Sequence, residues 1–243
     1  RVQRINKMYI IDFHSHILPG IDDGADSLEL AVQLLQKEYQ DGVRAIILTP
    51  HYRRRMFEPS MEQVKKAFSD LQGANPYSDL KLYLGCEYHA NMDMLEDIQE
   101  RRRPTMAESR CVLTEFADNA ETSFIRERTY QLLASGYTPI IAHIERYKAM
   151  VKDIAAIDEL SEQGCKIQVN ADSIIGKEGF FIKRFCKKLL DYDLIDLIGS
   201  DAHNLTDRPP RMGACAEYLE KKMGAEYVTQ LMIKNPIHYL KLE

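Results

Sequence analysis

The sequence predicts an α/β protein with a parallel sheet, arranged either as a barrel or as a doubly wound sheet. Short runs rich in Ile, Val and Leu alternate with amphipathic stretches from end to end of the chain. Near-continuous apolar runs of this kind are typical of parallel strands that helices cover on both faces. The alternation repeats about seven times without a linker or an internal repeat, so we expect one domain over residues 8–243.

The expected elements follow from the apolar runs and from the residues that can cap helices. Strands are expected over residues 9–13, 43–49, 80–85, 111–114, 138–142, 166–169 and 194–199. Ser27 can cap a helix that runs through Asp41 and ends at Gly42. The segment that starts at Ser60 and reaches Gln63 resembles a capping box that opens the next helix. Further helices are expected over residues 121–135, 152–163, 177–191 and 211–222.

Composition limits the classes of protein that the chain can be. Its 243 residues, 45% of them hydrophobic, can form one large domain with a sizeable core. A net charge of −5 argues against a general nucleic-acid binder, which is usually basic. Five cysteines without a Cys-x-x-Cys pair indicate reduced thiols and a cytoplasmic location. No apolar stretch approaches the roughly 20 residues that span a bilayer, so stable membrane insertion is not expected.

Both ends of the chain carry short polar segments outside the expected fold. Residues 1–7 are polar and basic and are interpreted as an expression remnant or a short native leader. The final Leu242 and Glu243 are interpreted as a possible cloning scar. The sequence leaves the oligomeric state open.

Imidazole and carboxylate groups occur just after, or at the end of, most of the expected strands. In chain order they are His14, His16, Asp23, His51, Glu87, Glu115, His143, Asp201 and His203. Five of the seven histidines belong to this set, which is not the scatter expected by chance. In a closed parallel barrel the C-terminal ends of all strands meet on one face, so these groups can share one pocket.

Each of these residues taken singly has a simpler interpretation. A lone histidine is more often a hydrogen-bonded core residue, and a glutamate after a strand can pair with a basic residue. Several carboxylates in one pocket, however, would repel one another strongly without cations. Imidazole and carboxylate are ligands that manganese, iron and zinc all accept. The combination therefore predicts a site for several metal ions and a metal-assisted hydrolysis.

This pattern resembles the PHP (polymerase and histidinol phosphatase) superfamily, and within it the bacterial CpsB/CapC-type protein-tyrosine phosphatases of capsule and exopolysaccharide synthesis. The resemblance extends from Met8 to about Asn235. Its motifs are Ile-Asp-Phe-His-Ser-His at 11–16, Ile-Asp-Asp-Gly-Ala-Asp-Ser at 21–27, Thr-Pro-His at 49–51, Gly-Cys-Glu at 85–87, Ala-His-Ile-Glu-Arg at 142–146 and Gly-Ser-Asp-Ala-His-Asn at 199–204. It implies a distorted TIM-like (β/α)7 barrel of the PHP type with a trinuclear, usually manganese-dependent site.

The resemblance also implies a role for each matching residue. One ion would lie among His14, His16, Glu87 and Asp201, a second among Glu87, Glu115 and His143, and a third among Asp23, His51 and His203. Iron or zinc could replace manganese. Arg146 and Arg208 match the positions that contact the phosphate, and either Asp201 or His203 could protonate the departing oxygen.

Other polar residues are weaker candidates. Arg53 opens an arginine run after His51 and could guide an acidic phosphopeptide, although such runs are usually solvated. Asn170 ends the sixth expected strand at a height where it could contribute, and His89 is expected near the pocket rim, packing behind it rather than reacting.

The predicted function is a metal-dependent protein-tyrosine phosphatase that acts on the phosphotyrosine tail of a bacterial tyrosine kinase controlling polysaccharide synthesis. The alternatives are a small-molecule phosphatase of the histidinol-phosphate type, a phosphopeptide-binding module with structural metals, and an amidohydrolase. The amidohydrolase is disfavoured because that family usually carries a carboxylated lysine where this chain has Glu115. A cysteine nucleophile is disfavoured because none of the five cysteines is followed by an arginine six residues later.

Overall fold

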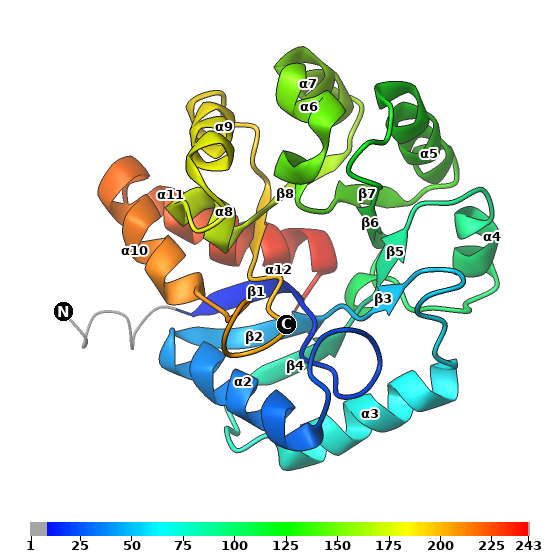
Figure 1. Ribbon diagram of the computed structural model, residues 1–243, viewed down its shortest axis with the longest axis vertical. Coiled ribbons are helices and arrows are strands. Elements are labelled where there is room, and N and C mark those ends of the chain that lie inside the picture. The colour runs from blue at the N-terminus through cyan, green and yellow to red at the C-terminus, as the bar shows by residue number, and fades with distance from the viewer. Residues whose placement is uncertain (1–8, 243) are drawn as a thin grey trace.

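The computed structural model describes residues 9–242 as a ring of parallel strands with helices packed around its outside (Figure 1). The predictions for residues 1–7 and for Glu243 lie outside the described residues. The strands are β1 Ile10–Ser15, β2 Val43–Leu48, β3 His51–Tyr52, β4 Lys81–Leu84, β5 Glu87–His89, β6 Cys111–Glu115, β7 Thr138–Ile141, β8 Lys166–Asn170 and β9 Leu197–Gly199.

Residues 9–242 form nine strands where seven were expected, because two short strands, β3 and β5, were not predicted. The second and third expected strands, 43–49 and 80–85, correspond to β2 and β4, and after breaks at residues 49–50 and 85–86 the chain continues as β3 and β5. Pro50, at the first break, has no N–H to donate to a neighbouring strand. β2 pairs with β4 and β3 pairs with β5, so the order of the strands is kept across both breaks.

The ring closes between β1 and β9. The backbone N–H of Asp201 donates to the carbonyl of His14 at 2.7 Å, and that of His16 donates to the carbonyl of Ala202 at 2.9 Å. Gly199 makes this approach possible, because a Cβ at that position would lie 2.4 Å from the Cβ of His14. From β5 the remaining strands follow in the order β6, β7, β8 and β9, all parallel. The predicted distorted barrel is confirmed.

Helices connect most of the strands on the outside of the ring. They are α2 Leu28–Gln40, α3 Met61–Ala74, α4 Met94–Gln99, α5 Thr122–Ala134, α6 Lys148–Lys152, α7 Ile154–Glu162, α8 Ala171–Ile175, α9 Phe180–Asp191, α10 Met212–Met223, α11 Ala225–Thr229 and α12 Asn235–Leu240. Three single-turn segments, η1 Met106–Glu108, η2 Ile144–Arg146 and η3 Gln230–Lys234, complete the list. α4, α6, α8, α11 and α12 were not predicted.

The predicted caps of α2 and α3 are confirmed, whereas two predicted helix boundaries are wrong. The Ser27 hydroxyl accepts from the Leu30 N–H, and Ser60 and Gln63 form both bonds of a capping box. The helix expected from residue 177 begins only at Phe180, because Gly179 before it has φ 103°. The helix expected from residue 152 begins at Ile154, since the Asp153 side chain caps a new helix there.

Apolar side chains pack inside the ring as well as between the ring and its helices. Phe13, Ile47, Leu113, Ile140 and Leu197, from five different strands, form one cluster of fully buried side chains. All five cysteines are buried and form no disulfide, as expected for reduced thiols. Within residues 9–242 no helix has the length and apolar character that crossing a membrane requires.

Candidate active site

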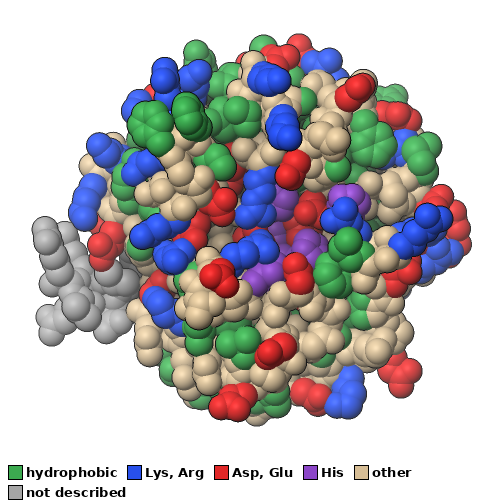
Figure 2. Space-filling view, viewed as in Figure 1, with side chains coloured by type: hydrophobic (Ala, Val, Ile, Leu, Met, Phe, Trp, Pro, Cys, Tyr) green, Lys and Arg blue, Asp and Glu red, His purple; other side chains and the backbone are tan. Residues whose placement is uncertain are grey.

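The predicted ligands come together at the C-terminal ends of the strands. A cavity of about 220 Å³ opens there, lined by six of them and by all three predicted arginines, Arg53, Arg146 and Arg208. Figure 2 shows histidine side chains at the bottom of a hollow in this face, with basic and acidic side chains around them. The prediction that strand ends would place these distant residues in one pocket is confirmed.

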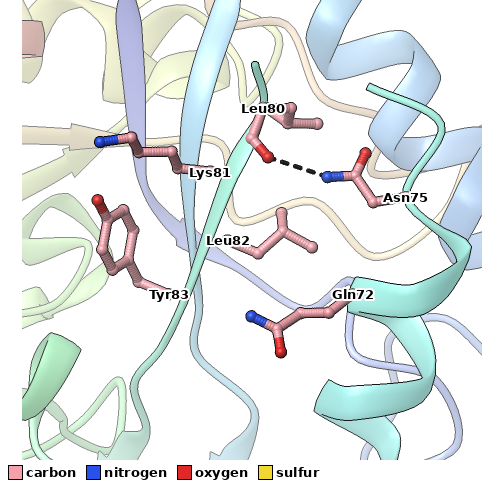
Figure 3. Close-up of a pocket in the computed structure, with 6 residues that line it drawn as sticks. All are labelled: Gln72, Asn75, Leu80, Lys81, Leu82 and Tyr83. Atoms are coloured by element: carbon pink, nitrogen blue, oxygen red, sulfur yellow. Dashed lines mark hydrogen bonds between the residues drawn. The ribbon is translucent and has the colours of Figure 1, made fainter. Parts of the chain in front are cut away.

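A second cavity, of about 330 Å³, lies away from these residues (Figure 3). Gln72 and Asn75 near the end of α3 line it together with residues 80–83 at the start of β4. The Asn75 amide donates to the carbonyl of Leu80 at 2.9 Å across this cavity. It contains no histidine or carboxylate and no predicted ligand, so it is not a second candidate for the catalytic site.

Two histidines from β1 and the residue after it lie at the centre of the site. His14 and His16 are both fully buried, and their Nε2 atoms lie 3.1 Å apart. The Nε2 of each histidine also lies 3.2 Å from Oε2 of Glu87.

The hydrogen bonds on the far side of these two rings determine where their protons lie. Oε1 of Gln168 accepts the backbone N–H of His143 at 2.8 Å, which fixes the orientation of the amide. His14 Nδ1, 3.2 Å from the same oxygen, must therefore donate, and His16 Nδ1 donates to Asp22 at 2.8 Å. Without a cation, burial opposes the charged form of both rings, but the neighbouring carboxylates outweigh it and raise the pKa of His14 and of His16. A cation between the rings would take the place of those protons and accept the lone pairs of both Nε2 atoms.

Three further buried atoms at this site have no hydrogen-bond partner in the described chain. They are Nδ1 of His51, Oε2 of Glu87 and Nε2 of His203. His203 donates its other ring nitrogen, Nδ1, to the carbonyl of Asp201 at 2.9 Å, which leaves Nε2 with a free lone pair. Buried polar atoms are normally paired, and unpaired ones require a specific reason. Several such donor atoms around one cavity fit divalent cations, and the residues present match the predicted metals chemically.

Three groups of side chains have donor atoms close enough together to hold an ion, each group within 4.8 Å. The groups are His16, Asp23, His51 and His203; His14, His16 and Asp201; and His51, Glu87 and Glu115. His143 joins them through its Nε2, which lies 2.9 Å from Oε1 of Glu87. These groups differ from the division that the resemblance implies. His16 and His51 each belong to two groups, whereas Glu87 belongs to one and His143 to none.

Opposite charges hold the central carboxylates in their ionised form. Burial alone would raise the pKa of Asp201, but Arg146, His14 and neighbouring groups outweigh it and hold that pKa well below its usual range. Burial likewise opposes ionisation of Glu87, but His14 and His51 hold its pKa well below the ordinary value. Both residues are therefore present as the anions that bind metals.

Two arginines connect the centre of the site to its opening. Nη1 of Arg146 lies 2.8 Å from Oδ2 of Asp201, and Nη2 of Arg208 lies 2.7 Å from the same atom. Both side chains remain partly exposed to the cavity, at 25% and 36%. Of the arginine run after His51 only Arg53 lines the cavity, while Arg54 pairs with Asp93 and Asp97.

Several residues that support the site were missed or underrated in the sequence. Asn170 donates to Oδ2 of Asp201 at 2.8 Å and accepts from the Gln168 amide at 2.9 Å. His89 lies 2.9 Å from Oε2 of Glu115 and so holds a candidate ligand, as its expected place behind the rim suggested. Asp22 and Gln168 were not predicted. A polar amide in the middle of an apolar strand was the available signal for Gln168, because such a group must find partners when it is buried.

The family described as "Capsular polysaccharide synthesis, CpsB/CapC" matches residues 10–241 of this chain. The chain belongs to the CpsB/CapC family. It is 35% identical to "Tyrosine-protein phosphatase CpsB" of Streptococcus pneumoniae over 93% of this chain and 96% of that protein. It is 33% identical to the protein of the same name from Streptococcus agalactiae, over 96% of this chain and 98% of the relative. The family predicted from the sequence is thereby confirmed.

Solved structures agree with the family assignment. One CpsB/CapC structure, from work on YwqE of Bacillus subtilis and CpsB of Streptococcus pneumoniae, described as unique metal-dependent tyrosine phosphatases, has a TM-score of 0.88 at 27% identity. That match covers 96% of this chain and 94% of the other. An organophosphorus hydrolase from Deinococcus radiodurans matches with a TM-score of 0.63 at 12% identity, which indicates a shared fold alone.

Proposed function

We propose that this protein is a metal-dependent protein-tyrosine phosphatase that hydrolyses phosphotyrosine on a bacterial tyrosine kinase regulating polysaccharide synthesis. The carrying observation is that buried atoms of His51, Glu87 and His203 form no hydrogen bond, next to a cavity that His51, Glu87, Arg146 and Arg208 line. The enzyme class agrees with the names of the relatives, which are tyrosine-protein phosphatases. We further propose a single catalytic domain and a cytoplasmic location, which the free buried thiols support.

The cofactor is proposed to be manganese, bound as three ions by the nine predicted ligands, with iron or zinc able to substitute. The three groups of donors and the facing Nε2 atoms of His14 and His16 support several ions in place of one. When bound, the ions supply the Lewis acidity that activates water and offsets charge on the phosphate.

The chain's own residues bind and orient the phosphate. Arg146 and Arg208 present planar guanidinium groups at the cavity and can each donate two hydrogen bonds to phosphate oxygens. Asp201 accepts from both, so it sets their positions before the substrate arrives. Arg53, which also lines the cavity, is a further candidate contact for the substrate.

The proton donor to the departing phenolate was left open between Asp201 and His203. Oδ2 of Asp201 already accepts from Arg146, Arg208 and Asn170, and its low pKa favours the anion. Ligation and orientation of the arginines are therefore the better role for Asp201. Burial and the nearby His16 lower the pKa of His203, so its Nε2 is suited to ligation at neutral pH as well.

The function is tested by measuring metal content and substrate choice together. Protein purified without added metal is analysed for manganese, iron and zinc, then assayed with a phosphotyrosine peptide before and after chelation. We expect activity to disappear on chelation and to return with manganese. Full activity without metal would refute the mechanism, and a strong preference for histidinol phosphate would favour the small-molecule alternative. Binding of the phosphopeptide without phosphate release by metal-loaded protein would favour a binding module.

A further inference from the structure

An exposed aromatic pair lies at the start of α9, close to the candidate active site. Phe181 is 84% exposed and Phe180 is 72% exposed, the highest values of any large hydrophobic side chain in the described part of the protein. Their rings contact each other edge to face, with centroids 5.8 Å apart. Exposed apolar side chains that occur singly need no explanation, but two adjacent and almost fully exposed rings point to a binding surface.

Basic side chains surround this pair. Lys177, Arg184 and Lys188 are exposed, and their side chains make no hydrogen bond or ion pair within residues 9–242. The other two cations of this segment are engaged: Lys183 donates to the carbonyl of Ile175, and Lys187 donates to Asp191 at 2.6 Å. Lys177 still interacts electrostatically with Asp172, but three exposed cations in one segment of a chain of net charge −5 make this a local positive surface.

The surface is continuous with the rim of the cavity. Oε1 of Glu178 lies 3.5 Å from Nη2 of Arg146, the arginine that contacts Asp201. Phe180 follows Glu178 by two residues, so their Cα atoms are within about 7.6 Å of each other. Figure 1 shows α8 and α9 beside the ring of strands, and Figure 2 shows hydrophobic and basic side chains over α9 on the face that exposes the histidines.

We propose that Lys177, Phe180, Phe181, Arg184 and Lys188, here called the α9 ledge, bind the polypeptide that flanks the phosphotyrosine. The inference rests on the proposed function, because a protein substrate must cross the rim of the cavity on its way to Arg146. An extended flank of about four residues covers roughly 13 Å, which exceeds the separation of at most about 7.6 Å between the Cα atoms of Glu178 and Phe180. The cations select a flank with acidic side chains, and the two rings select apolar or aromatic side chains within it.

The geometry favours a polypeptide over an anionic membrane. The ledge is tied through Glu178 to an arginine of the reaction site, so its occupant must reach into the cavity, as a peptide chain does.

The test compares small and extended substrates in the metal-loaded enzyme. The variants are Phe180→Ala/Phe181→Ala and Lys177→Glu/Arg184→Glu, with Tyr130→Ala, another exposed aromatic on α5, as the matched control. The substrates are free phosphotyrosine, a ten-residue phosphotyrosine peptide with acidic flanks, and the same peptide with lysine flanks. We expect the KM for the acidic peptide to rise at least tenfold in both variants, while kcat and the turnover of free phosphotyrosine stay unchanged.

Three outcomes would overturn the proposal. The first is an unchanged KM for the acidic peptide, and the second is an equal loss of kcat/KM with free phosphotyrosine. The third is a loss of kcat/KM in Lys177→Glu/Arg184→Glu that is the same for the acidic and the lysine-flanked peptide. Binding of wild type to phosphatidylglycerol vesicles that the variants lose, with peptide KM unchanged, would assign the ledge to a membrane. Fluorescence anisotropy with labelled peptide reports binding separately from turnover. If the wild type binds the acidic peptide through the ledge but hydrolyses no substrate, the proposed function is refuted while the binding role of the ledge stands.

Discussion

Gln168 offers the most direct test of how the site is organised. It lies on β8, whose side chains include none of the predicted ligands, yet its amide contacts His143, His14 and, on its own strand, Asn170. Oε1 accepts from the His143 N–H and lies 3.2 Å from Nδ1 of His14, while Nε2 donates to Asn170, which in turn donates to Asp201. We predict that Gln168→Leu weakens metal binding although Gln168 is not itself a ligand.

The magnitude follows from the groups that the substitution leaves unpaired. The backbone N–H of His143 and Oδ1 of Asn170 are buried, and each costs about 1 to 3 kcal/mol without a partner. The expected loss of stability is therefore about 2 to 6 kcal/mol, which lowers the melting temperature but leaves a protein of ordinary stability folded in the cold. The ring of His14 is no longer held in one tautomer, and loss of such a partner typically lowers metal affinity about 10- to 100-fold.

The assay separates affinity from stability. Metal affinity is measured by competition with a chelator at low temperature, and urea unfolding of the metal-free protein gives the loss of stability. Gln168→Glu keeps the oxygen that accepts from His143 and His14 but loses the donor to Asn170, so it should bind metal better than Gln168→Leu. Gln72→Leu, on exposed α3 surface, is the matched control. Wild-type affinity in folded Gln168→Leu, or equal losses in both Gln168 variants, would refute the reasoning.

Three other predictions concern the same region. His14→Ala and Asp201→Ala should abolish phosphatase activity while circular dichroism still shows a folded protein; normal turnover in either purified variant would contradict the ligand assignment. Arg208→Ala should cost about 2 to 4 kcal/mol of transition-state stabilisation, as for the loss of one preorganised donor, and so lower kcat/KM roughly 30- to 1,000-fold. An unchanged kcat/KM would remove Arg208 from the site. Burial and the neighbouring Asp12 raise the pKa of Glu38 well above its ordinary 4.5. The folded state therefore binds the Glu38 proton more tightly than the unfolded chain does, and it loses stability as the pH rises above 4.5. Glu38→Gln should therefore become more stabilising, relative to wild type, from acid to neutral pH in urea unfolding, and a difference that does not change with pH would contradict this.

The barrel and the nine candidate ligands could be predicted because both depend on local features of the chain. Apolar runs show where strands lie, and a polar residue next to the end of a run shows what that strand presents at the mouth of a barrel. The supporting residues could not be predicted in this way. Gln168 acts on His14, 154 positions away, and nothing in either local segment indicates that contact. The grouping of donors is likewise a property of the folded site, so His16 and His51 could not be assigned to two groups beforehand.

The two short strands that were not predicted, β3 and β5, are also where ligands are placed. β3 and β5 begin at His51 and Glu87, immediately after the breaks, and these two residues are paired in register across neighbouring strands. Nδ1 of His51 consequently lies 3.0 Å from Oε2 of Glu87. One strand further, β5 pairs His89 with Glu115 in the same way, and this places the His89 ring against that carboxylate. Apolar runs do not reveal strands of two or three residues, because the geometry of the site, rather than the regularity of the sheet, determines where the backbone runs there.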